Sequence, residues 1–431
     1  MYNISDKKPP QGAGKKKGKI KMQLIKTPTK GMNDYLPRET RLREYVKSVI
    51  IRAYEKSGFS MIETPAVEHI ENLTGKNGGD NEKLIFKIMK RGEKLNEAAN
   101  GDAELCDSGL RYDLTVPLSR YYANNQAKLS SPFMAMQIGN VWRADRPQKG
   151  RFRQFTQCDI DILGDATPLA EITLISATTG VLRELGFDNF TVRINDRRLL
   201  KVCADFCGFK PEDCDKVFIT LDKMDKIGLD GVKKELTEEG FAPESVEKYV
   251  SLYEDCGCVS VSEFAAERLG GNGADIAASL EGIMRCATAA TAGGCSLKFD
   301  PTLVRGMSYY TGTIFEISMD GYGYSVGGGG RYDEMLAKFS GQKTPACGFS
   351  LGFERIVAAL ADRGFEPPAA ERSVAFLASK NMDEEKMLAM LSDAAQLRAE
   401  GARVLVTPRM KNVGFQKTKL ADDGYSEFVE Y

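Results

Sequence analysis

The 431-residue chain has one histidine, one tryptophan and no run of 18 or more apolar residues. The lack of such a run excludes a predicted membrane-spanning helix, and the N-terminus lacks the apolar core of a signal peptide. With only His69 available, chemistry that uses a histidine base has one candidate, and nothing in VEHIEN marks it as activated. We therefore expect a protein without membrane partners whose chemistry does not depend on histidine side chains.

The two common nucleotide-binding loops are also missing. The Gly-Lys pairs at 14–15, 18–19 and 75–76 are not followed by Ser or Thr, which excludes a P-loop. GYGYSV at 321–326 fails the dinucleotide pattern, because Val326 stands where glycine is needed. A nucleotide would have to bind by other means.

The ten cysteines show no zinc-knuckle spacing. Neither the Cys203 and Cys207 pair nor the Cys256 and Cys258 pair is separated by two residues, and only one histidine exists to help them. No metal cage made of protein ligands alone is expected. Ten cysteines in a large chain without an export signal predict free structural thiols in a reducing compartment, the cytoplasm.

The length predicts two to four domains, and the formal net charge is only −1. Residues 1–29 are rich in Lys, Gly and Pro, which predicts a disordered basic arm. Two interpretations of this arm remain open: a solvated tail, or a segment with weak attraction to nucleic acid.

Positive charge is concentrated at 143–157, RADRPQKGRFRQFTQ. Its five basic residues face one carboxylate, that of Asp145; they are Arg143, Arg146, Lys149, Arg151 and Arg153. Apolar, alternating stretches at 133–143 and 151–163 flank the loop, which predicts an antiparallel hairpin. Side chains of the second strand that share a face are Arg151, Arg153, Phe155, Gln157, Asp159 and Asp161. That face runs from cationic to anionic, so it could hold a molecule of the opposite polarity.

Other segments have clear periodicity. A helix is predicted after Pro37, with Leu42, Val46, Val49, Ile50 and Ala53 on one face. FSMIETP at 59–65 predicts a strand, and LRYDLTV at 110–116 predicts an alternating strand with Asp113 on its polar face. Residues 191–300 read as an inserted helical module. TIFEISM and PACGFSL predict further strands, and the second passes into a helix. After a linker at 364–371, alternating strands and helices predict a small α/β domain at 372–431.

Several motifs resemble those of the histidyl-tRNA synthetases, a class II aminoacyl-tRNA synthetase family. WRADRPQKGRFRQFTQCDIDI is similar to motif 2, GFSLGFERI to motif 3, and GFSMIETPAV to motif 1, which contributes to a dimer interface. LVRGMSYYTGTIFE and GGGGRYDEML resemble signatures of the histidyl enzymes and their close paralogues. RYDLTVPLSRY, together with Asp161, is similar to the eukaryotic-like branch. Five motifs in the order of the family make the resemblance specific.

The resemblance implies an α+β fold with a mixed, mostly antiparallel six-stranded sheet flanked by helices, a helical insertion and a C-terminal anticodon-binding domain. The implied domains are a catalytic core at 30–190 and 301–363, the insertion at 191–300, and an anticodon-binding-like domain at 372–431. Motif 1 implies a homodimer.

The implied reaction is activation of L-histidine with ATP to histidyl-adenylate and pyrophosphate, then transfer of histidine to the 3′ end of tRNA(His). The substrate's own carboxylate attacks the α-phosphate, so the protein needs to supply positioned positive charge rather than a nucleophile. Arginine suits that task because its planar guanidinium makes bidentate phosphate contacts. ATP is expected to arrive with Mg²⁺.

Roles follow from the resemblance, residue by residue. For ATP, it implies Arg143 at the α-phosphate, Arg151 beside the triphosphate, Arg355 at the γ-phosphate, Phe155 on adenine, and Asp145 near adenine or a metal. For histidine, it implies Asp113, Thr115 and Gln157 around the α-ammonium, Asp161 and Tyr310 at the imidazole edge, and Tyr309 in the same pocket or in the core. Arg305 would lie between the carboxylate and the α-phosphate, so Arg305 and Arg143 are the expected catalytic residues. Arg146 and Gln148 resemble positions that meet the tRNA acceptor end.

Glycines 327–330 would let the backbone approach the substrates closely, with a plain flexible loop as the alternative. Two departures from the family weaken the match. Ser308 stands where an aspartate is usual, and the last domain is short, as if the chain stopped before the family's final strands and helix. Other functions are therefore open: a regulator like the histidine-binding subunit of ATP phosphoribosyltransferase, or a module that senses uncharged tRNA.

Overall fold

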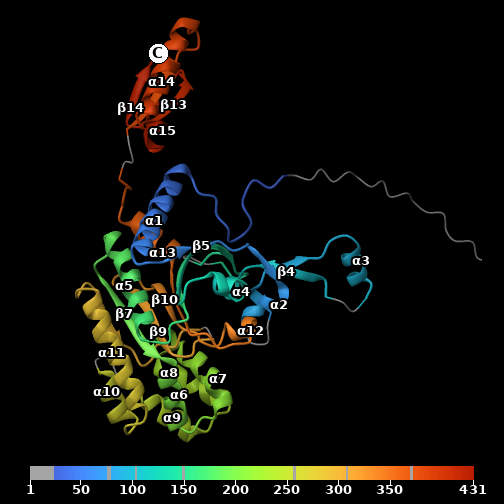
Figure 1. The fold of residues 1–431 in the computed structure, drawn as a ribbon, viewed down its shortest axis with the longest axis vertical. Helices are drawn as coiled ribbons and strands as arrows, with labels where there is room; N and C mark the ends of the chain where they lie inside the picture. Colours follow the sequence, from blue (N-terminus) through green and yellow to red (C-terminus); the bar gives the residue numbers. More distant parts are fainter. Residues whose placement is uncertain are drawn as a thin grey trace, which may run out of the picture.

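The computed structural model describes residues 24–74, 79–101, 104–147, 151–255, 259–306, 309–368 and 372–431. Its centre is an eight-stranded sheet in the order β1-β5-β6-β11-β10-β9-β7-β8 (Figure 1). The strands are β1 Ser60–Met61, β5 Phe133–Trp142, β6 Gln154–Leu163, β7 Phe190–Asp196, β8 Ser296–Phe299, β9 Thr313–Met319, β10 Ser325–Arg331 and β11 Ala346–Leu351.

The six strands from β5 to β7 in this order pair antiparallel, and the edge strands β1 and β8 pair parallel to their neighbours. The prediction of a mixed, mostly antiparallel sheet is confirmed, although the number of strands is eight rather than six. The extra strands are short ones at the two edges. Of FSMIETP, only Ser60–Met61 is in a strand.

The predicted hairpin around the basic loop is present. Strands β5 and β6 pair from Phe133 opposite Leu163 to Trp142 opposite Gln154, so the loop joins two rigid strands. Three helices pack together at this part of the sheet: α1 Pro37–Lys56, α5 Leu169–Glu184 and α13 Phe353–Asp362 (Figure 1). On α1 the predicted apolar face is buried, except that Ala53 is half-buried.

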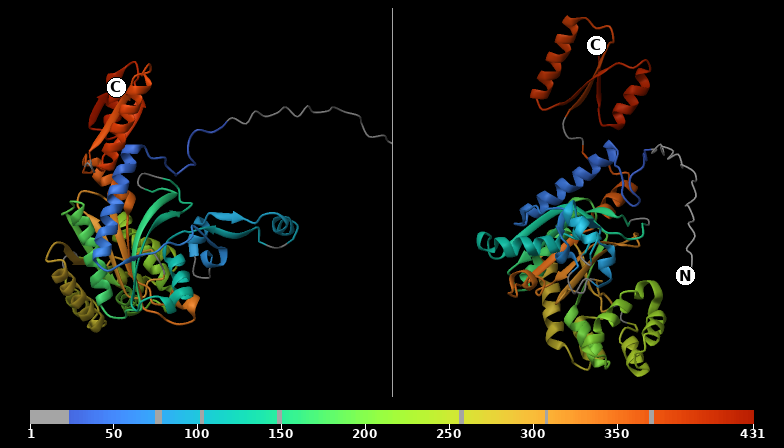
Figure 2. Two further views of the ribbon diagram at one scale, coloured as in Figure 1. Left: turned by 45° about the horizontal axis from the view of Figure 1, so that its top comes forward. Right: turned by 90° about the vertical axis from the view of Figure 1, so that its right-hand side faces the viewer.

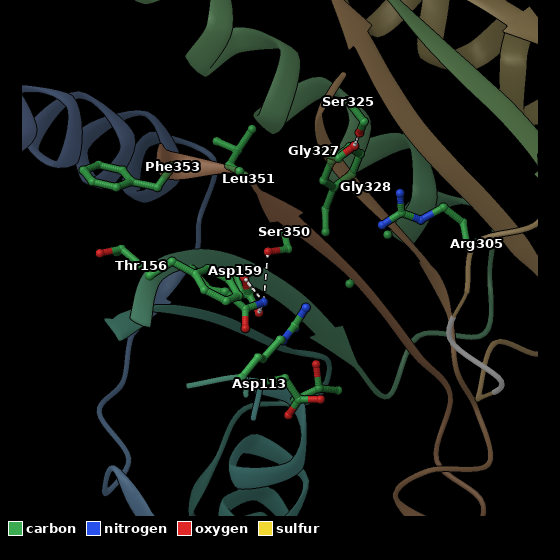
Figure 3. Close-up of a pocket in the computed structure, with 18 of the residues that line it drawn as sticks. Asp113, Thr156, Asp159, Arg305, Ser325, Gly327, Gly328, Ser350, Leu351 and Phe353 are labelled. Carbon is green, nitrogen blue, oxygen red and sulfur yellow. Dashed lines mark hydrogen bonds between the residues drawn. The ribbon is translucent and has the colours of Figure 1, made fainter. Parts of the chain in front are cut away.

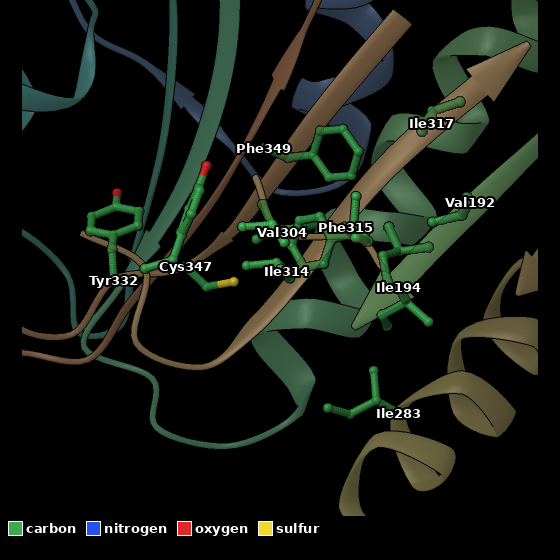
Figure 4. Packing of buried hydrophobic residues seen from close by; sticks show 14 of the residues in the cluster. Val192, Ile194, Ile283, Val304, Ile314, Phe315, Ile317, Tyr332, Cys347 and Phe349 are labelled. Carbon is green, nitrogen blue, oxygen red and sulfur yellow. The ribbon is translucent and has the colours of Figure 1, made fainter. Parts of the chain in front are cut away.

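One apolar core extends from α1 through the sheet into the helical insertion. In Figure 4, Phe315 of β9 and Phe349 of β11 lie beside Ile194 of β7, with Ile283 approaching from an insertion helix. The two phenyl rings stack with centroids 5.0 Å apart. Because this core fixes the strands that carry the polar side chains, it also fixes the geometry of the cavity described below.

The prediction of a strand over 110–116 is wrong. Strand β4 Cys106–Leu110 ends at Leu110, and helix α4 Thr115–Asn125 begins five residues later. In the turn between them, an Asp113 carboxylate oxygen accepts the Val116 N–H at 3.0 Å, which stabilises the first turn of the helix. Arg111 is buried and donates to the carbonyl oxygens of Thr64 and Asn140 at 2.7 and 2.8 Å. The alternation of apolar residues therefore came from a tightly bonded turn.

Strand β4 belongs to a second sheet of three strands, with β2 Val67–His69 and β3 Lys87–Met89 on either side of it. The remaining small elements near the core are helices α2 Ile70–Leu73, α3 Glu93–Ala99 and α12 Ala337–Ser340, and the 3-10 helices η1 Gly79–Leu84 and η2 Gln126–Lys128. In Figure 2 the segment that carries β3, α3 and β4 projects from the body of the fold.

The described residues between β7 and β8 form six α-helices: α6 Arg197–Phe206, α7 Cys214–Leu221, α8 Met224–Glu238, α9 Pro243–Ser251, α10 Val261–Glu263 and α11 Ala274–Ala290. The 3-10 helix η3 Pro211–Asp213 and the π-helix η4 Phe264–Arg268 complete this part. Because β7 and β8 pair within the central sheet, the helical segment is narrower than the predicted 191–300. Cys203 and Cys207 are buried free thiols, as predicted, whereas Cys256 and Cys258 lie outside the described residues.

The C-terminal part has the predicted alternation of strands and helices. Its elements are β12 Ser373–Ala378, α14 Glu384–Ala399, β13 Arg403–Pro408, α15 Val413–Asp422 and β14 Glu427–Glu430. The three strands form a parallel sheet in the order β13-β12-β14, with its own small apolar core. Figure 2 shows it as a separate lobe beyond α1. Within the described residues, no helix is both long and apolar enough to cross a membrane.

Candidate active site

A cavity of about 510 Å³ opens over β6, β10 and β11 (Figure 3). Most of the predicted site residues line it: Asp113, Thr115, Arg143, Asp145, Arg151, Phe155, Gln157, Asp161, Arg305, Tyr309, Tyr310 and Arg355. Of the two residues predicted to meet the tRNA, Arg146 is exposed and does not line the cavity, and Gln148 lies outside the described residues.

Glycines of β10 form part of the cavity floor, and they are a paired strand rather than a flexible loop. A Cβ atom on Gly329 would lie 2.0 Å from the carbonyl oxygen of Gly348 on β11. A Cβ on Gly348 would lie 2.0 Å from a carboxylate oxygen of Asp161. Side chains at these positions would separate the strands or fill the cavity, so the glycines bring the backbone close to whatever binds there.

One end of the cavity carries three buried carboxyl groups, those of Asp113, Asp159 and Asp161, which are 5%, 4% and 4% exposed. Burial raises the pKa of Asp113, and burial together with the charge of Asp161 raises the pKa of Asp159 well above its usual range. The pKa of Asp161 is raised to about 7 by burial, against the lowering effect of a hydrogen bond from Tyr332. Such a cluster favours a ligand with positive charge or N–H donors.

Tyrosines form the wall beside these carboxyls. The Tyr332 hydroxyl donates to Asp161 at 2.5 Å, and its ring lies 6.0 Å from that of Tyr309. The rings of Tyr309 and Tyr310 meet edge to face at 4.9 Å. Burial raises the pKa of Tyr310, so its hydroxyl keeps its proton at neutral pH. Tyr309 is therefore both a packed aromatic residue and part of the cavity lining.

The other end of the cavity carries arginines. The Arg355 guanidinium donates to the Ser325 carbonyl oxygen at 2.5 Å and lies 5.4 Å from the Tyr324 ring. Its pKa is lowered by burial and then by the positive charges of Arg151 and Arg305. Like charges held this close favour an anion between them.

Arg305 has a φ of 61°, which is uncommon for a residue with a side chain. Its guanidinium pairs with the Glu316 carboxylate of β9, and its buried Nε has no hydrogen-bond partner among the described residues. A Cβ on Gly328 would lie 2.5 Å from the centre of this guanidinium, so only glycine leaves room for it (Figure 3). An unpaired buried donor of this kind is ready for an acceptor on a ligand.

Arg143 lines the cavity and is held by a carbonyl oxygen and two aromatic rings. Its Nε donates to the Tyr112 carbonyl oxygen at 3.1 Å, and its guanidinium lies 4.3 Å from the Tyr112 ring and 5.1 Å from the Phe155 ring. Burial raises the pKa of Asp113 and of Asp159, and the positive charge of Arg143 offsets part of that rise. The arginine is therefore close enough to influence the carboxyl end while it is held by aromatic rings.

The outer part of the cavity differs from the prediction in one respect. Arg151 and Asp145 form an ion pair with 3.6 Å between their nearest atoms, and both line the cavity. Arg153, predicted on the same strand face, donates to the Asp145 carbonyl oxygen at 3.0 Å and does not line the cavity. The reason is that β6 begins at Gln154, so the alternation of a strand does not extend to Arg153.

Some cavity residues were not assigned by the sequence: Tyr112, Asp159, Glu316, Tyr332 and Ser350. Asp159 was on the predicted polar face, and Tyr332 and Glu316 stand inside motifs already singled out, so a closer reading of those motifs could have found them. Ser350 stands inside the segment that resembles motif 3, but what it faces follows from the pairing of β11 with β6, where it lies opposite Asp159.

The sequence model of the histidyl-tRNA synthetase family matches residues 31–356. The chain belongs to this family.

Individual relatives agree with that membership. A histidine–tRNA ligase of Leifsonia xyli subsp. xyli is 44% identical over 423 residues, which cover 94% of each chain. The crystal structure of histidyl-tRNA synthetase from Nostoc sp. PCC 7120 has a TM-score of 0.76 at 28% identity and covers 93% of this chain and 90% of that one. A structure from Bacillus halodurans, described as an ATP phosphoribosyltransferase regulatory subunit/histidyl-tRNA synthetase, has a TM-score of 0.75 at 21% identity, covering 95% and 99%. At that identity the likeness shows the fold alone.

Proposed function

We propose that this cavity is where the chain activates L-histidine with ATP to histidyl-adenylate and pyrophosphate, before histidine passes to tRNA(His). Membership of the family supports this two-step aminoacylation. The observation that carries the assignment to the cavity is the segregation of charge within it. Three carboxyl groups suit the cationic side of an amino acid, and an arginine cluster suits a triphosphate.

In the first step, the carboxylate of histidine attacks the α-phosphate of ATP and pyrophosphate leaves. The protein supplies no nucleophile; it holds the two substrates in line and stabilises the charge that builds up on phosphorus. Arg143 and Arg305 are the proposed catalytic residues, because both are cationic side chains that line the cavity. The unpaired Nε of Arg305 supports a contact with the substrate carboxylate or the α-phosphate.

Histidine would lie at the carboxyl end. Asp113, Gln157 and Thr115 would accept from its α-ammonium, which is supported by the buried and unpaired Oε1 of Gln157. Asp161 and the Tyr310 hydroxyl would bind the two imidazole nitrogens. Because each nitrogen has a dedicated partner, an isosteric ring without one of them would leave a buried polar group unpaired.

ATP would lie at the arginine end. Arg355 and Arg151 would hold the γ-phosphate and the rest of the triphosphate, and Phe155 would stack on adenine. Magnesium would enter on the phosphates, as that ion usually does, with the half-buried Asp145 as a carboxylate able to complete its shell. The hard oxygen ligands of a carboxylate and of phosphates fit this ion, and its chemistry would be to neutralise charge on the leaving pyrophosphate.

The tRNA would approach from the side of Arg146 and Gln148 and extend to residues 372–431, the proposed anticodon-binding-like domain. Support for the second contact comes from Phe415 on α15, which is 52% exposed with the ammonium of Lys419 at 6.0 Å from its ring. An exposed aromatic ring beside a cation is what an unstacked base favours.

We also propose a homodimer in the cytoplasm. The exposed apolar residue Met61 lies on the edge strand β1, inside the segment that resembles motif 1. All eight cysteines in the described part of the chain are free thiols, as a reducing compartment favours. Size-exclusion chromatography with light scattering tests the dimer, because it measures the molar mass of the assembly.

The decisive assay is histidine-dependent exchange of labelled pyrophosphate into ATP. The proposal predicts exchange with histidine and none without it. A protein that binds histidine but catalyses no exchange would instead be a silent regulator. Charging of full-length tRNA(His) is then compared with charging of an acceptor-stem minihelix, and equal rates would show that residues 372–431 do not read the anticodon.

A further inference from the structure

The amide of Gln157 is held by two neighbours at the carboxyl end of the cavity. Its Nε2 donates to both carboxylate oxygens of Asp159, at 3.2 and 3.4 Å, and to the Ser350 hydroxyl at 3.2 Å. Its Oε1 is buried and has no hydrogen-bond partner in the part of the chain that the structure describes. All the contacts therefore lie on the nitrogen side of the amide, and the oxygen side is left for a ligand.

Strand geometry produces this arrangement. Gln157 and Asp159 are two residues apart on β6, so they share a face, and Ser350 of β11 lies directly opposite Asp159 (Figure 3). On the other side, Gln137 of β5 is opposite Asp159, but its own amide is engaged with Leu114 and Thr64 at 3.1 Å each. Among these strand neighbours, Gln157 is the amide left for Asp159 to orient.

The two ends of an amide differ in chemistry, and this decides its orientation. Both oxygens of Asp159 accept from this NH₂ group. Burial raises the pKa of Asp159, but the Ser350 hydroxyl and the charge of Arg143 favour its ionised form. An ionised carboxylate only accepts hydrogen bonds, so it holds the NH₂ group and repels the carbonyl oxygen. If the amide of Gln157 rotated by 180°, its oxygen would face Asp159 and its NH₂ would face the ligand. That orientation would oppose an ammonium group, whereas the observed one offers it an acceptor.

We propose that Asp159, assisted by Ser350, is a positioning residue that fixes the Gln157 amide with its oxygen toward the substrate, so that the site selects ligands with an α-ammonium. The inference rests on the proposed function, because it takes histidine as the occupant of this end. It gives Asp159 a role in amino-acid selection that acts through Gln157 rather than through a contact of its own.

The test uses three ligands and the full-length protein. L-Histidine carries both the ammonium and the carboxylate, histidinol keeps only the ammonium, and imidazole-4-propionate keeps only the carboxylate. In calorimetric titrations, Asp159→Asn should raise the Kd for L-histidine and for histidinol by roughly tenfold each. The Kd for imidazole-4-propionate should change by less than about twofold. Asparagine offers both a donor and an acceptor, so it no longer determines the orientation of Gln157.

A double-mutant cycle separates positioning from direct contact. In the Gln157→Ala background, Asp159→Asn should cause no further loss of affinity for the ligands that carry an ammonium group. A further loss of similar size would overturn the inference, because Asp159 would then meet the ammonium itself. Equal weakening of all three ligands by Asp159→Asn would also overturn it, since that pattern indicates a general structural defect.

Two more variants guard against a folding artefact. Ser350→Ala should give the same selectivity pattern with a smaller loss, and Ser350→Thr, which keeps the hydroxyl, should restore binding. Asp188→Asn removes an exposed carboxylate outside the cavity and is the matched control. If the unmodified protein binds imidazole-4-propionate as tightly as L-histidine, the proposed histidine site itself fails, whatever the variants do.

Discussion

The guanidinium of Arg305 is paired with the carboxylate of Glu316, which reaches it from the neighbouring strand β9. The other oxygen of Glu316 faces Arg193 of β7 at 3.5 Å, and Arg193 is in turn paired with Asp300 at 2.5 Å. The arginine with the unusual backbone is thus the last member of a chain of ion pairs across the sheet. Such a chain holds its side chain at the cavity without using its Nε.

Arg305→Ala should lower the kcat of pyrophosphate exchange by roughly 10²–10³, the usual cost of removing one preorganised donor to a developing charge. The KM for histidine should change by less than about threefold, because the contact strengthens as the transition state forms. Initial rates at varied histidine and ATP provide both constants. Arg285→Ala, at an exposed position of α11, is the control. An unchanged kcat with a raised KM would contradict the catalytic role.

Tyr332→Phe should shift the acid limb of the pH profile of kcat/KM for histidine to higher pH. The Tyr332 hydroxyl stabilises the ionised form of Asp161 and so lowers its pKa, which is about 7 with that hydrogen bond in place. Without it the pKa rises, more of the carboxyl is protonated at pH 7, and it can no longer accept from imidazole. The ratio of kcat/KM between variant and unmodified protein should fall from pH 9 to pH 6, a comparison that cancels the titration of the substrate. A ratio that does not change with pH would exclude this mechanism.

Arg355→Met should raise the KM for ATP by roughly tenfold and leave the KM for histidine nearly unchanged. Methionine keeps much of the apolar stem but removes the charge that, with Arg151, would hold the triphosphate. Pyrophosphate exchange at saturating concentrations of the other substrate separates the two constants. Equal effects on both substrates would argue against a separate ATP end.

Gly329→Ala should destabilise the protein by about 1–3 kcal/mol, the usual cost of overpacking. The new methyl group would start 2.0 Å from the Gly348 carbonyl oxygen of the paired strand, and backbone cannot move aside easily. Gly323→Ala is the matched control, since a Cβ there meets nothing within 4 Å. Thermal unfolding of both variants makes the comparison. An equal Tm for the two would mean that β10 and β11 are less rigidly paired than their register implies.

Local patterns in the sequence were sufficient for the helix at α1, the β5–β6 hairpin and the strand-to-helix passage at β11 and α13. Each depends on periodicity or turn residues within a short stretch, so it can be recognised without knowing what packs against it. Most of the residues to which the resemblance gave a role line one cavity. The local pattern failed at 110–116, where a turn with apolar residues at alternate positions has the same pattern as a strand.

By itself, the sequence determined which residues are charged, that basic residues cluster directly before β6, and that the carboxyl groups of Asp159 and Asp161 alternate with apolar residues along β6. The tertiary structure decided how those charges are used. Ser350 orients Gln157 only because β11 pairs with β6 in one register, and Arg193 meets Glu316 only because β7 pairs with β9 with these two residues opposite each other. Pairing between distant strands depends on the packing of the whole core, so no local pattern encodes it.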